Sequence, residues 1–470
     1  MANDVSCSKQ KSNENVKNNE NSMDSSWSWM IVVAAFSSNT ISDGILYTMG
    51  MIEEELLVEF NESKLLTSWV PSIVSGMQLC GGPIASQLIN RYSCHTVAII
   101  GSLLSAISFL ISAYAQSVFA LIIIIGFGSG TGFCFLYCSA IVSIGMNFEK
   151  YRSVATGIAS AGTGCGTFLF SPLVAFFIEK FGWRKTMLIL SGILLNCVIF
   201  GALFRPLKRS MRNQGEKCTN QHEIYTNHAN TLHKELDRPE NKKIEIASKA
   251  YCGCNLAEIL KSIFKFMNFN LLKNPVFVLL MASSFVTSTF FYVPIFLLPS
   301  YSSALGMKEL GPSILMITGI SNTLGRLFWG YVSNKTSNRI WIYSTSLVIC
   351  GIATALFTIS IDFVSLSICS AVFAFTASAC CVLSSVILAD LLGLDQLNNA
   401  FGLILFTDVL GTFIGPPIYG IIYDLSNAYV PGIILTGLMI TFSGFILFFV
   451  PTLQRYVLRK QSRLNCNQNE

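Results

Sequence analysis

The chain has 470 residues, of which 52% are hydrophobic and only 12% are charged, whereas soluble domains carry roughly 25% charged residues. With a mean hydropathy of +0.56, too few charged side chains are present to cover a soluble surface. The composition excludes a soluble enzyme, a disordered scaffold and a secreted disulfide-rich domain, and it predicts a polytopic membrane protein. The net charge of +5 indicates no particular partner.

The first 26 residues are polar and contain no apolar segment typical of a cleavable signal peptide, so we expect the first spanning helix to be its own signal. A helix needs about 20 mostly apolar residues to cross the hydrocarbon core. On this rule six spans precede a polar stretch at 205–273 and six follow it. They lie near 29–51, 65–89, 96–114, 118–145, 153–178 and 185–204, and near 275–299, 312–333, 340–360, 363–389, 399–423 and 430–450.

The central stretch has two parts. Residues 205–253 are polar and predict a disordered tether. Over 256–272 apolar residues recur at helical spacing with Lys261 and Lys265 between them, which predicts a helix lying on the inner leaflet. The expected domains are a cytoplasmic tail at 1–26, a six-helix bundle at 27–204, a cytoplasmic loop at 205–273, a second six-helix bundle at 274–451 and a cytoplasmic tail at 452–470.

Lysine and arginine gather on one side of these spans. If both termini lie in the cytoplasm, 25 Lys and Arg residues face it and five face the opposite side. Without the central stretch the ratio is still 12 to five. Because cytoplasmic loops carry an excess of Lys and Arg, we expect both termini in the cytoplasm.

The two halves of the chain repeat each other at an offset of 245 residues. Residues 155–179 and 400–424 share six identities in 25 positions, including Gly166-Thr167-Phe168 with Gly411-Thr412-Phe413. A six-span unit duplicated in the same orientation is the architecture of a major facilitator, in which two bundles surround a site near the membrane midplane. The sequence therefore predicts an all-α membrane protein with 12 transmembrane helices, arranged as two six-helix bundles about a pseudo-two-fold axis.

Several motifs resemble those of one family of facilitators. The entrance of span one, Asp24-Ser25-Ser26-Trp27-Ser28-Trp29, resembles the first signature of the monocarboxylate transporter family, with Ser at two positions where Gly is usual. Residues 147–162 resemble its second signature, which leads into span five. Gly82-Pro83-Ile84-Ala85-Ser86, Asn398-Asn399-Ala400-Phe401-Gly402 and Gly415-Pro416-Pro417 are also typical of it.

The resemblance covers about 27–450 and implies a plasma-membrane transporter of small organic solutes that works by alternating access. It implies neither an enzyme nor a protein with a cofactor or a nucleic-acid partner; the partners expected are the solute and the lipid bilayer. Some relatives need a single-span accessory glycoprotein, and whether this chain needs one stays open.

Two positions depart from the proton-coupled lactate carriers of that family. Those carriers have a Lys in span one, and its place here is taken by Tyr47. They also have an Asp one turn before an Arg in span eight, where this chain has Asn322 before Arg326. The resemblance therefore implies a carrier of other small organic solutes, and a proton as co-substrate stays open.

Ionisable groups inside spans are the strongest functional candidates, because each costs about 2.5–3.5 kcal/mol at the bilayer centre. Arg326 offers a planar fork that matches a carboxylate; alternatively it pairs with a nearby Asp and only locks helices. Asp43 and Asp408 could be its counter-ions or bind a cationic group of the solute, and Asp43 could instead cap backbone amides at a break in its helix. Tyr47 and Asn322 lie one turn from Asp43 and Arg326 respectively, and their alternative role is helix packing.

A second group of polar residues lies at the cytoplasmic ends of spans. We expect these residues to pair across the two bundles and to close an inner gate when the carrier faces outward. For the cations the alternative is retention by the positive-inside rule alone. The group consists of Asn90, Arg91, Lys150, Arg152, Asn334, Lys335 and Asp390.

Other functional classes lack their motifs in this sequence. No phosphate-binding P-loop and no potassium-channel filter is present, and all four histidines fall outside the spans. Cys252 and Cys254 form a lone pair, so no metal site is expected. The predicted function is secondary transport of a small organic solute that carries a carboxylate. The alternatives are a uniporter of zwitterions such as amino acids or creatine-like solutes, and a receptor or scaffold that keeps the fold without transporting.

Overall fold

The computed structural model describes residues 26–148, 151–204, 271–272, 274–336, 338–392 and 394–455. Within these ranges every element is helical and none is a strand, which confirms the all-α class. The expected tails, the central loop and its helix at 256–272 lie wholly or largely outside the described residues.

The helices of the first half follow the predicted spans but extend further. The first span, predicted to end at 51, continues through a turn at Thr48 as far as Phe60. The elements are α2 (Ser26–Tyr47), α3 (Met49–Phe60), α4 (Lys64–Cys80), α5 (Gly82–Tyr92), α6 (Cys94–Ser112), α7 (Val118–Leu121), the π-helix η1 (Ile122–Ser129), α8 (Gly130–Asn147) and α9 (Arg152–Leu203).

The second half has the same succession of spans. Its first span bends at Tyr292, just before Pro294 begins a new helical turn. The elements are α13 (Pro275–Phe291), α14 (Val293–Ala304), the 3₁₀-helix η4 (Lys308–Leu310), α15 (Gly311–Lys335), α16 (Arg339–Leu356), the 3₁₀-helix η5 (Phe357–Ile359), α17 (Phe363–Leu392), α18 (Leu394–Ser426) and α19 (Val430–Phe448).

Nine helical segments of the described residues are long and apolar enough to cross a membrane. One of them, Val154–Leu203, supplies two spans because it is divided at Gly182, whose φ of +75° lies in the left-handed region that favours glycine. Helices α4 with α5, and α15, lie where spans two and eight are predicted. The prediction of twelve spans is thereby confirmed.

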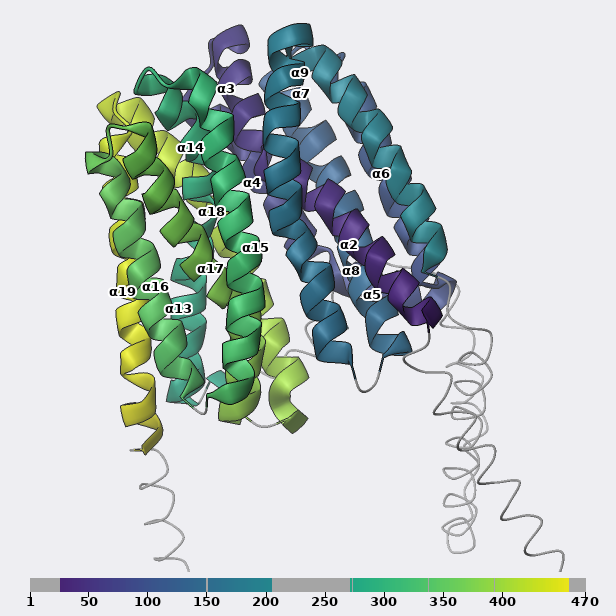
Figure 1. The fold of residues 1–470 in the computed structure, drawn as a ribbon, viewed down its shortest axis with the longest axis vertical. Helices are drawn as coiled ribbons and strands as arrows, with labels where there is room; N and C mark the ends of the chain where they lie inside the picture. The colour runs from purple at the N-terminus through teal and green to yellow at the C-terminus, as the bar shows by residue number, and fades with distance from the viewer. Residues whose placement is uncertain are drawn as a thin grey trace, which may run out of the picture. The chain divides into compact units, whose positions relative to one another are not determined.

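Three helix pairs join the halves of the described chain (Figure 1). Helix α4 packs against α18 and α9 packs against α15, and α3 also meets α14. The first two pairs are equivalent under the repeat, since each joins the second span of one half to the fifth span of the other. Gly164 permits the α9–α15 approach, because a Cβ atom there would lie 2.7 Å from both Gly319 O and Thr323 N. Backbone therefore meets backbone where the halves touch.

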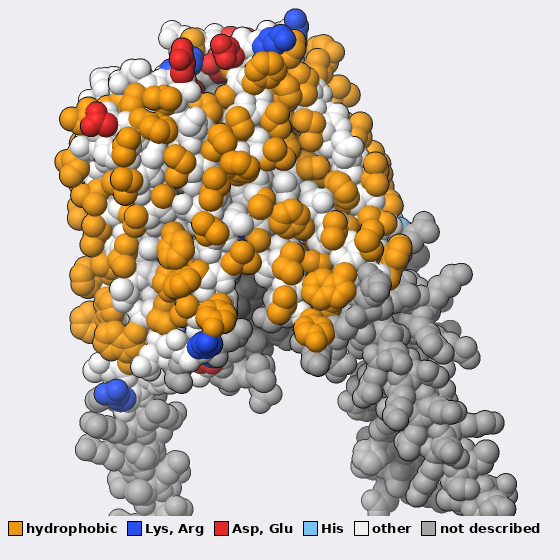
Figure 2. Space-filling model, in the orientation of Figure 1, with side chains coloured by type: hydrophobic (Ala, Val, Ile, Leu, Met, Phe, Trp, Pro, Cys, Tyr) orange, Lys and Arg blue, Asp and Glu red, His pale blue; other side chains and the backbone are white. Residues whose placement is uncertain are grey.

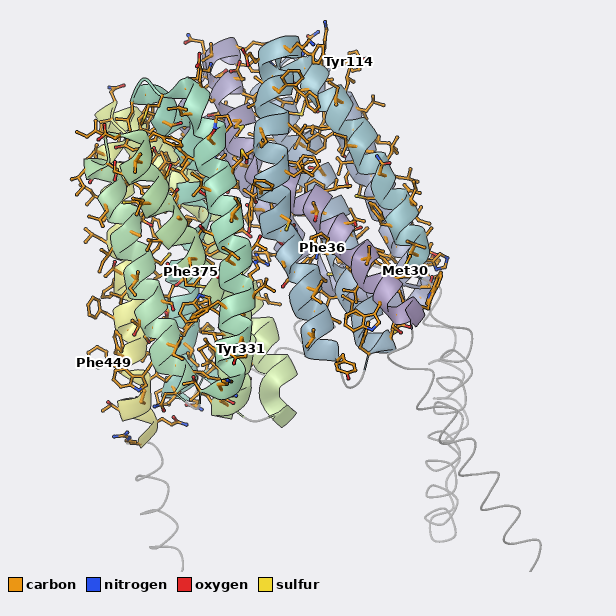
Figure 3. All side chains as sticks on the ribbon, in the orientation of Figure 1. Met30, Phe36, Tyr114, Tyr331, Phe375 and Phe449 are labelled. Atoms are coloured by element: carbon orange, nitrogen blue, oxygen red, sulfur yellow. The ribbon has the colours of Figure 1, made fainter. Side chains whose placement is uncertain are left out.

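The surface has the pattern of a membrane protein. On the face in Figure 2, hydrophobic side chains cover the middle and charged side chains gather at two ends. We call these the Ser26 end, where α2 begins and α19 ends, and the Lys64 end, where α3 leads into α4 (Figure 1). Exposed Tyr114 lies at the Lys64 end and exposed Tyr331 at the Ser26 end (Figure 3), as aromatic side chains do at the two membrane interfaces. The protein is a multi-pass membrane protein.

Candidate functional site

Arg326 reaches from the second half of the chain to the first. It lies on α15, where its Nε donates to Asn322 Oδ1 at 2.9 Å. Its Nη1 donates at 2.9 Å to the backbone oxygen of Ser160 on α9. Because Asn322 is four residues earlier on the same helix face, its amide holds the plane of the guanidinium toward the interface between the halves.

The charge of Arg326 has no direct acidic partner among the described side chains. The ion pairs among the described residues are made by other cations, namely Lys64, Arg184, Lys308 and Arg339. The third contact of the guanidinium is to Cys381 Sγ on α17, at 4.0 Å. Both alternatives for Arg326 therefore keep some support. Its bond to the Ser160 oxygen ties two helices together, as a structural role would require, and its guanidinium has no ion-pair partner among the described residues, as binding of a solute anion would require.

Asp43 is held by two neighbouring helices of its own half. Its carboxylate is 6% exposed and accepts hydrogen bonds from Gln78 Nε2 on α4 at 2.7 Å and from Thr163 Oγ1 on α9 at 2.6 Å. Helix α2 continues through this residue to Tyr47, so the break considered at Asp43 and Gly44 is wrong and the turn comes at Thr48. Asp43 does not touch Arg326, but their opposite charges are close enough to interact through space.

Tyr47 and Asn322 line one narrow cavity between the halves, whose volume of about 10 Å³ is close to what one water molecule needs. The ring of Tyr47, at the end of α2, lies 6.1 Å from that of Tyr292, which connects α13 to α14. The walls mix hydroxyl and apolar groups, as is usual for small-molecule sites. The lining residues are Tyr47, Thr167, Phe291, Ile295, Thr318, Gly319, Asn322, Phe373, Ala374 and Ala377.

Asp408 lies apart from this cluster. It is on α18 and accepts a hydrogen bond from Ser284 Oγ on α13 at 2.7 Å. At the repeat offset of 245 residues it takes the place of Thr163, the residue that binds Asp43. In each half an acid accepts a hydrogen bond from a hydroxyl across the first and fifth spans. The acid is on the first span in the first half, as Asp43, and on the fifth span in the second half, as Asp408.

Three of the seven residues expected at an inner gate have described side chains, and all lie at the Ser26 end. Asp390 accepts two hydrogen bonds of 2.8 Å from Arg339 Nη1, within its own half. Lys335 lies over the ring of Tyr331, at 4.6 Å. Arg91 lies over the ring of Tyr92. The side chains of the other four, Asn90, Lys150, Arg152 and Asn334, are outside the described part of the structure.

Some residues of the site were missed by the sequence analysis. Ser160 takes part through a backbone oxygen, for which a sequence carries no signal. Tyr137 lies near enough to Asp43 and Arg326 to interact electrostatically with both. Gln78, whose amide binds Asp43, could have been found from the sequence, because it is a polar residue inside a predicted span.

Comparison with known proteins agrees with the resemblance noted in the motifs. A family model described as the Major Facilitator Superfamily matches residues 27–358 and 314–464. Monocarboxylate transporter 14 of Mus musculus is 27% identical over 481 residues, covering 94% of this chain and 93% of its own. Monocarboxylate transporter 12 of Xenopus laevis is 27% identical over 437 residues, covering 92% and 90%. Monocarboxylate transporter 7 of Homo sapiens is 26% identical over 436 residues, covering 86% and 82%.

Proposed function

Since the chain belongs to the Major Facilitator Superfamily of membrane transporters, where it is similar to monocarboxylate transporters, we propose that it carries a small organic carboxylate across the plasma membrane. The solute binds between the two halves, and the halves rock about it so that the site faces each side of the membrane in turn. Both termini are cytoplasmic in this proposal, so the Lys64 end faces outward.

The observation that carries the proposal is the position of Arg326 and its set of hydrogen-bond partners. Its guanidinium lies at the interface between the halves, is aligned by Asn322, and contacts no carboxylate of the described residues. A charge inside a spanning helix is costly unless it has a functional or structural partner. A carboxylate supplies that partner through two parallel hydrogen bonds.

The nearby acid favours a simple carboxylate over a zwitterion. Both oxygens of Asp43 already accept hydrogen bonds, from Gln78 and Thr163, and only 6% of the residue is exposed, so a cationic group of a solute has little access to it. Asp43 instead offsets the charge of Arg326 through space when the site is empty. The aromatic rings that line the cavity, those of Tyr47, Phe291 and Phe373, suit the apolar part of the solute.

Proton coupling is not part of the proposal. By resemblance, proton-coupled members carry Lys and Asp where this chain has Tyr47 and Asn322. The expected flux therefore follows the solute gradient and does not require an inward proton gradient.

The test is uptake into liposomes that contain the purified protein alone. Lactate and a creatine-like zwitterion are supplied, each with and without an inward proton gradient, and binding is followed in parallel by thermal stabilisation. We expect Arg326→Gln to lower the affinity for the carboxylate by roughly tenfold or more, as loss of a charged hydrogen bond does, and Arg326→Lys to recover part of it.

The matched control is Arg184→Gln, which removes a partly exposed Arg that pairs with Glu59 at the Lys64 end. It should leave the affinity unchanged. If Arg326→Gln protein that folds normally binds and transports the carboxylate like the wild type, the assignment of Arg326 is wrong. Transport only in the presence of a separate single-span glycoprotein would mean that the purified chain is an incomplete carrier.

A further inference from the structure

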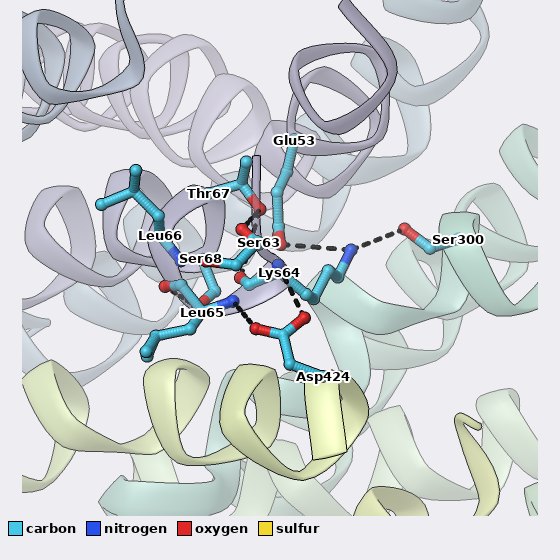
Figure 4. A network of polar contacts seen from close by, with 9 residues as sticks. All are labelled: Glu53, Ser63, Lys64, Leu65, Leu66, Thr67, Ser68, Ser300 and Asp424. Carbon is cyan, nitrogen blue, oxygen red and sulfur yellow. Dashed lines mark hydrogen bonds and ion pairs between the residues drawn. The ribbon is translucent and has the colours of Figure 1, made fainter. Parts of the chain in front are cut away.

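A buried ammonium group lies at the Lys64 end, between the two halves (Figure 4). Lys64 is the first residue of α4 and is only 2% exposed, and its Nζ lies 3.2 Å from Glu53 Oε1 on α3. The same Nζ donates at 3.2 Å to Ser300 Oγ on α14. The hydropathy pattern places Lys64 in a loop between spans, whereas the structure makes it a packed residue with a partner in each half.

The beginning of α4 is capped from the other half. The two oxygens of Asp424, on α18, accept hydrogen bonds of 2.9 Å from the backbone N–H groups of Lys64 and Leu65. The first N–H groups of a helix have no partner within it, and a carboxylate placed there also interacts favourably with the helix dipole. Ser63 caps the next N–H group from within the first half.

The backbones of the halves meet around this cluster. A Cβ atom on Gly420 would lie 2.7 Å from Leu65 Cα, and one on Gly50 would lie 2.8 Å from Phe296 Cα. Both glycines lie where a helix of one half presses on a helix of the other. The halves are therefore in direct backbone contact at the Lys64 end.

The division of contacts between the halves decides how this end can open. The ion pair of Glu53 with Lys64 belongs wholly to the first half, whereas the hydrogen-bond partners of Lys64 from the second half are Ser300 and Asp424. Separating a buried ion pair is among the most costly changes in a protein. Here the halves can part without it, because the charge of Lys64 keeps its acidic partner.

We propose that Lys64, Ser300 and Asp424 form the latch of the Lys64 end, which opens by releasing the two second-half side chains while Glu53 stays paired with Lys64. The proposal rests on alternating access but not on the identity of the solute or on the role of Arg326. It adds a closing device at the end opposite to the one where the sequence predicts a gate.

The test measures the opening directly, without a solute. Nitroxide labels are attached through genetically encoded amino acids at Val58 and Ile361, two exposed positions at the Lys64 end of different halves. Electron-spin distance measurements in nanodiscs then give the ratio of open to closed molecules. We expect Asp424→Asn to raise this ratio about fivefold or more, because the amide keeps one acceptor oxygen but loses the second acceptor and the charge that favours the start of the helix. Ser300→Ala should raise it about two- to fivefold.

Two variants serve as controls. Lys308→Gln breaks an exposed contact between the halves, to Glu55 at 3.4 Å, which should change the ratio less than twofold because exposed pairs contribute little. Tyr419→Phe removes a buried hydroxyl that bonds to none of the described residues nearby, and it should also leave the ratio unchanged.

Each result of these measurements either supports the latch or overturns it. A ratio in Asp424→Asn equal to that of the wild type, in protein that elutes and melts normally, overturns the latch. If that variant does not fold, Ser300→Ala decides by the same criterion. An effect of Lys308→Gln as large as that of Ser300→Ala would also overturn it, because any contact between the halves would then hold the end shut. Failure of carboxylate transport leaves this measurement unaffected.

Discussion

A methyl group on Gly164 tests the contact between α9 and α15 most directly. The added Cβ would lie 2.7 Å from Gly319 O and from Thr323 N, and ordinary contact begins at 3.4 Å. Since both atoms belong to backbone, the two helices must part by roughly 0.7 Å or more. Such overpacking costs about 1–3 kcal/mol, while exchanging Gly for Ala within a helix returns about 0.5–1 kcal/mol.

The matched control lies on the other span of α9, beyond its division at Gly182. Gly192 has no atom within 4 Å of an added Cβ, so Gly192→Ala should only gain the helix-propensity term. We expect the thermal unfolding midpoint in detergent, followed by tryptophan fluorescence, to fall for Gly164→Ala and to hold or rise for Gly192→Ala. The free energies of unfolding should differ by about 1–3 kcal/mol between the two variants. If Gly164→Ala unfolds at the temperature of Gly192→Ala, the helices do not approach as closely as described.

Three further substitutions each remove one contact. Thr163→Val removes the donor to Asp43 and should destabilise the protein by about 1–3 kcal/mol because the carboxylate loses a buried partner; Thr163→Ser should melt like the wild type. Asn322→Ala frees the guanidinium of Arg326 and should weaken carboxylate binding by roughly fivefold without lowering the melting temperature much, and unchanged binding in a titration would argue against an aligning role. Asp390→Asn removes a partly exposed ion pair and should change the free energy of unfolding by less than about 1 kcal/mol. A large fall in the thermal unfolding midpoint would show that this pair stabilises more than the contact within its own half.

The span arrangement could be predicted from the sequence because the hydrocarbon core imposes it. Apolar stretches of about 20 residues have few other uses, and the twelve predicted spans match the helices, including the division of α9 at Gly182. Arg326 with Asn322 was also within reach, since polar residues four apart inside one span lie on the same face. The family resemblance in the motifs agrees with the relatives found by comparison.

Contacts between distant residues were out of reach for physical reasons. Lys64 counts as a loop cation in any hydropathy profile, because the profile does not register that Asp424 approaches its helix across 360 residues. The break proposed at Asp43 was wrong because partners on two other helices satisfy its carboxylate, so that its own helix need not open. The contribution of Ser160 is a backbone oxygen, which every residue type has.

The acid and the hydroxyl have changed places between the two halves, which bears on how this protein can be engineered. In one half the acid stands on the first span, as Asp43, and in the other it stands on the fifth, as Asp408. A repeated helix pair can thus carry the acid of this contact on either of its two helices. The double exchange Asp43→Thr with Thr163→Asp should therefore be more stable than the sum of the two single changes predicts. The two halves therefore share the position of the acid–hydroxyl contact, between their first and fifth spans, but differ in which of the two spans supplies the acid.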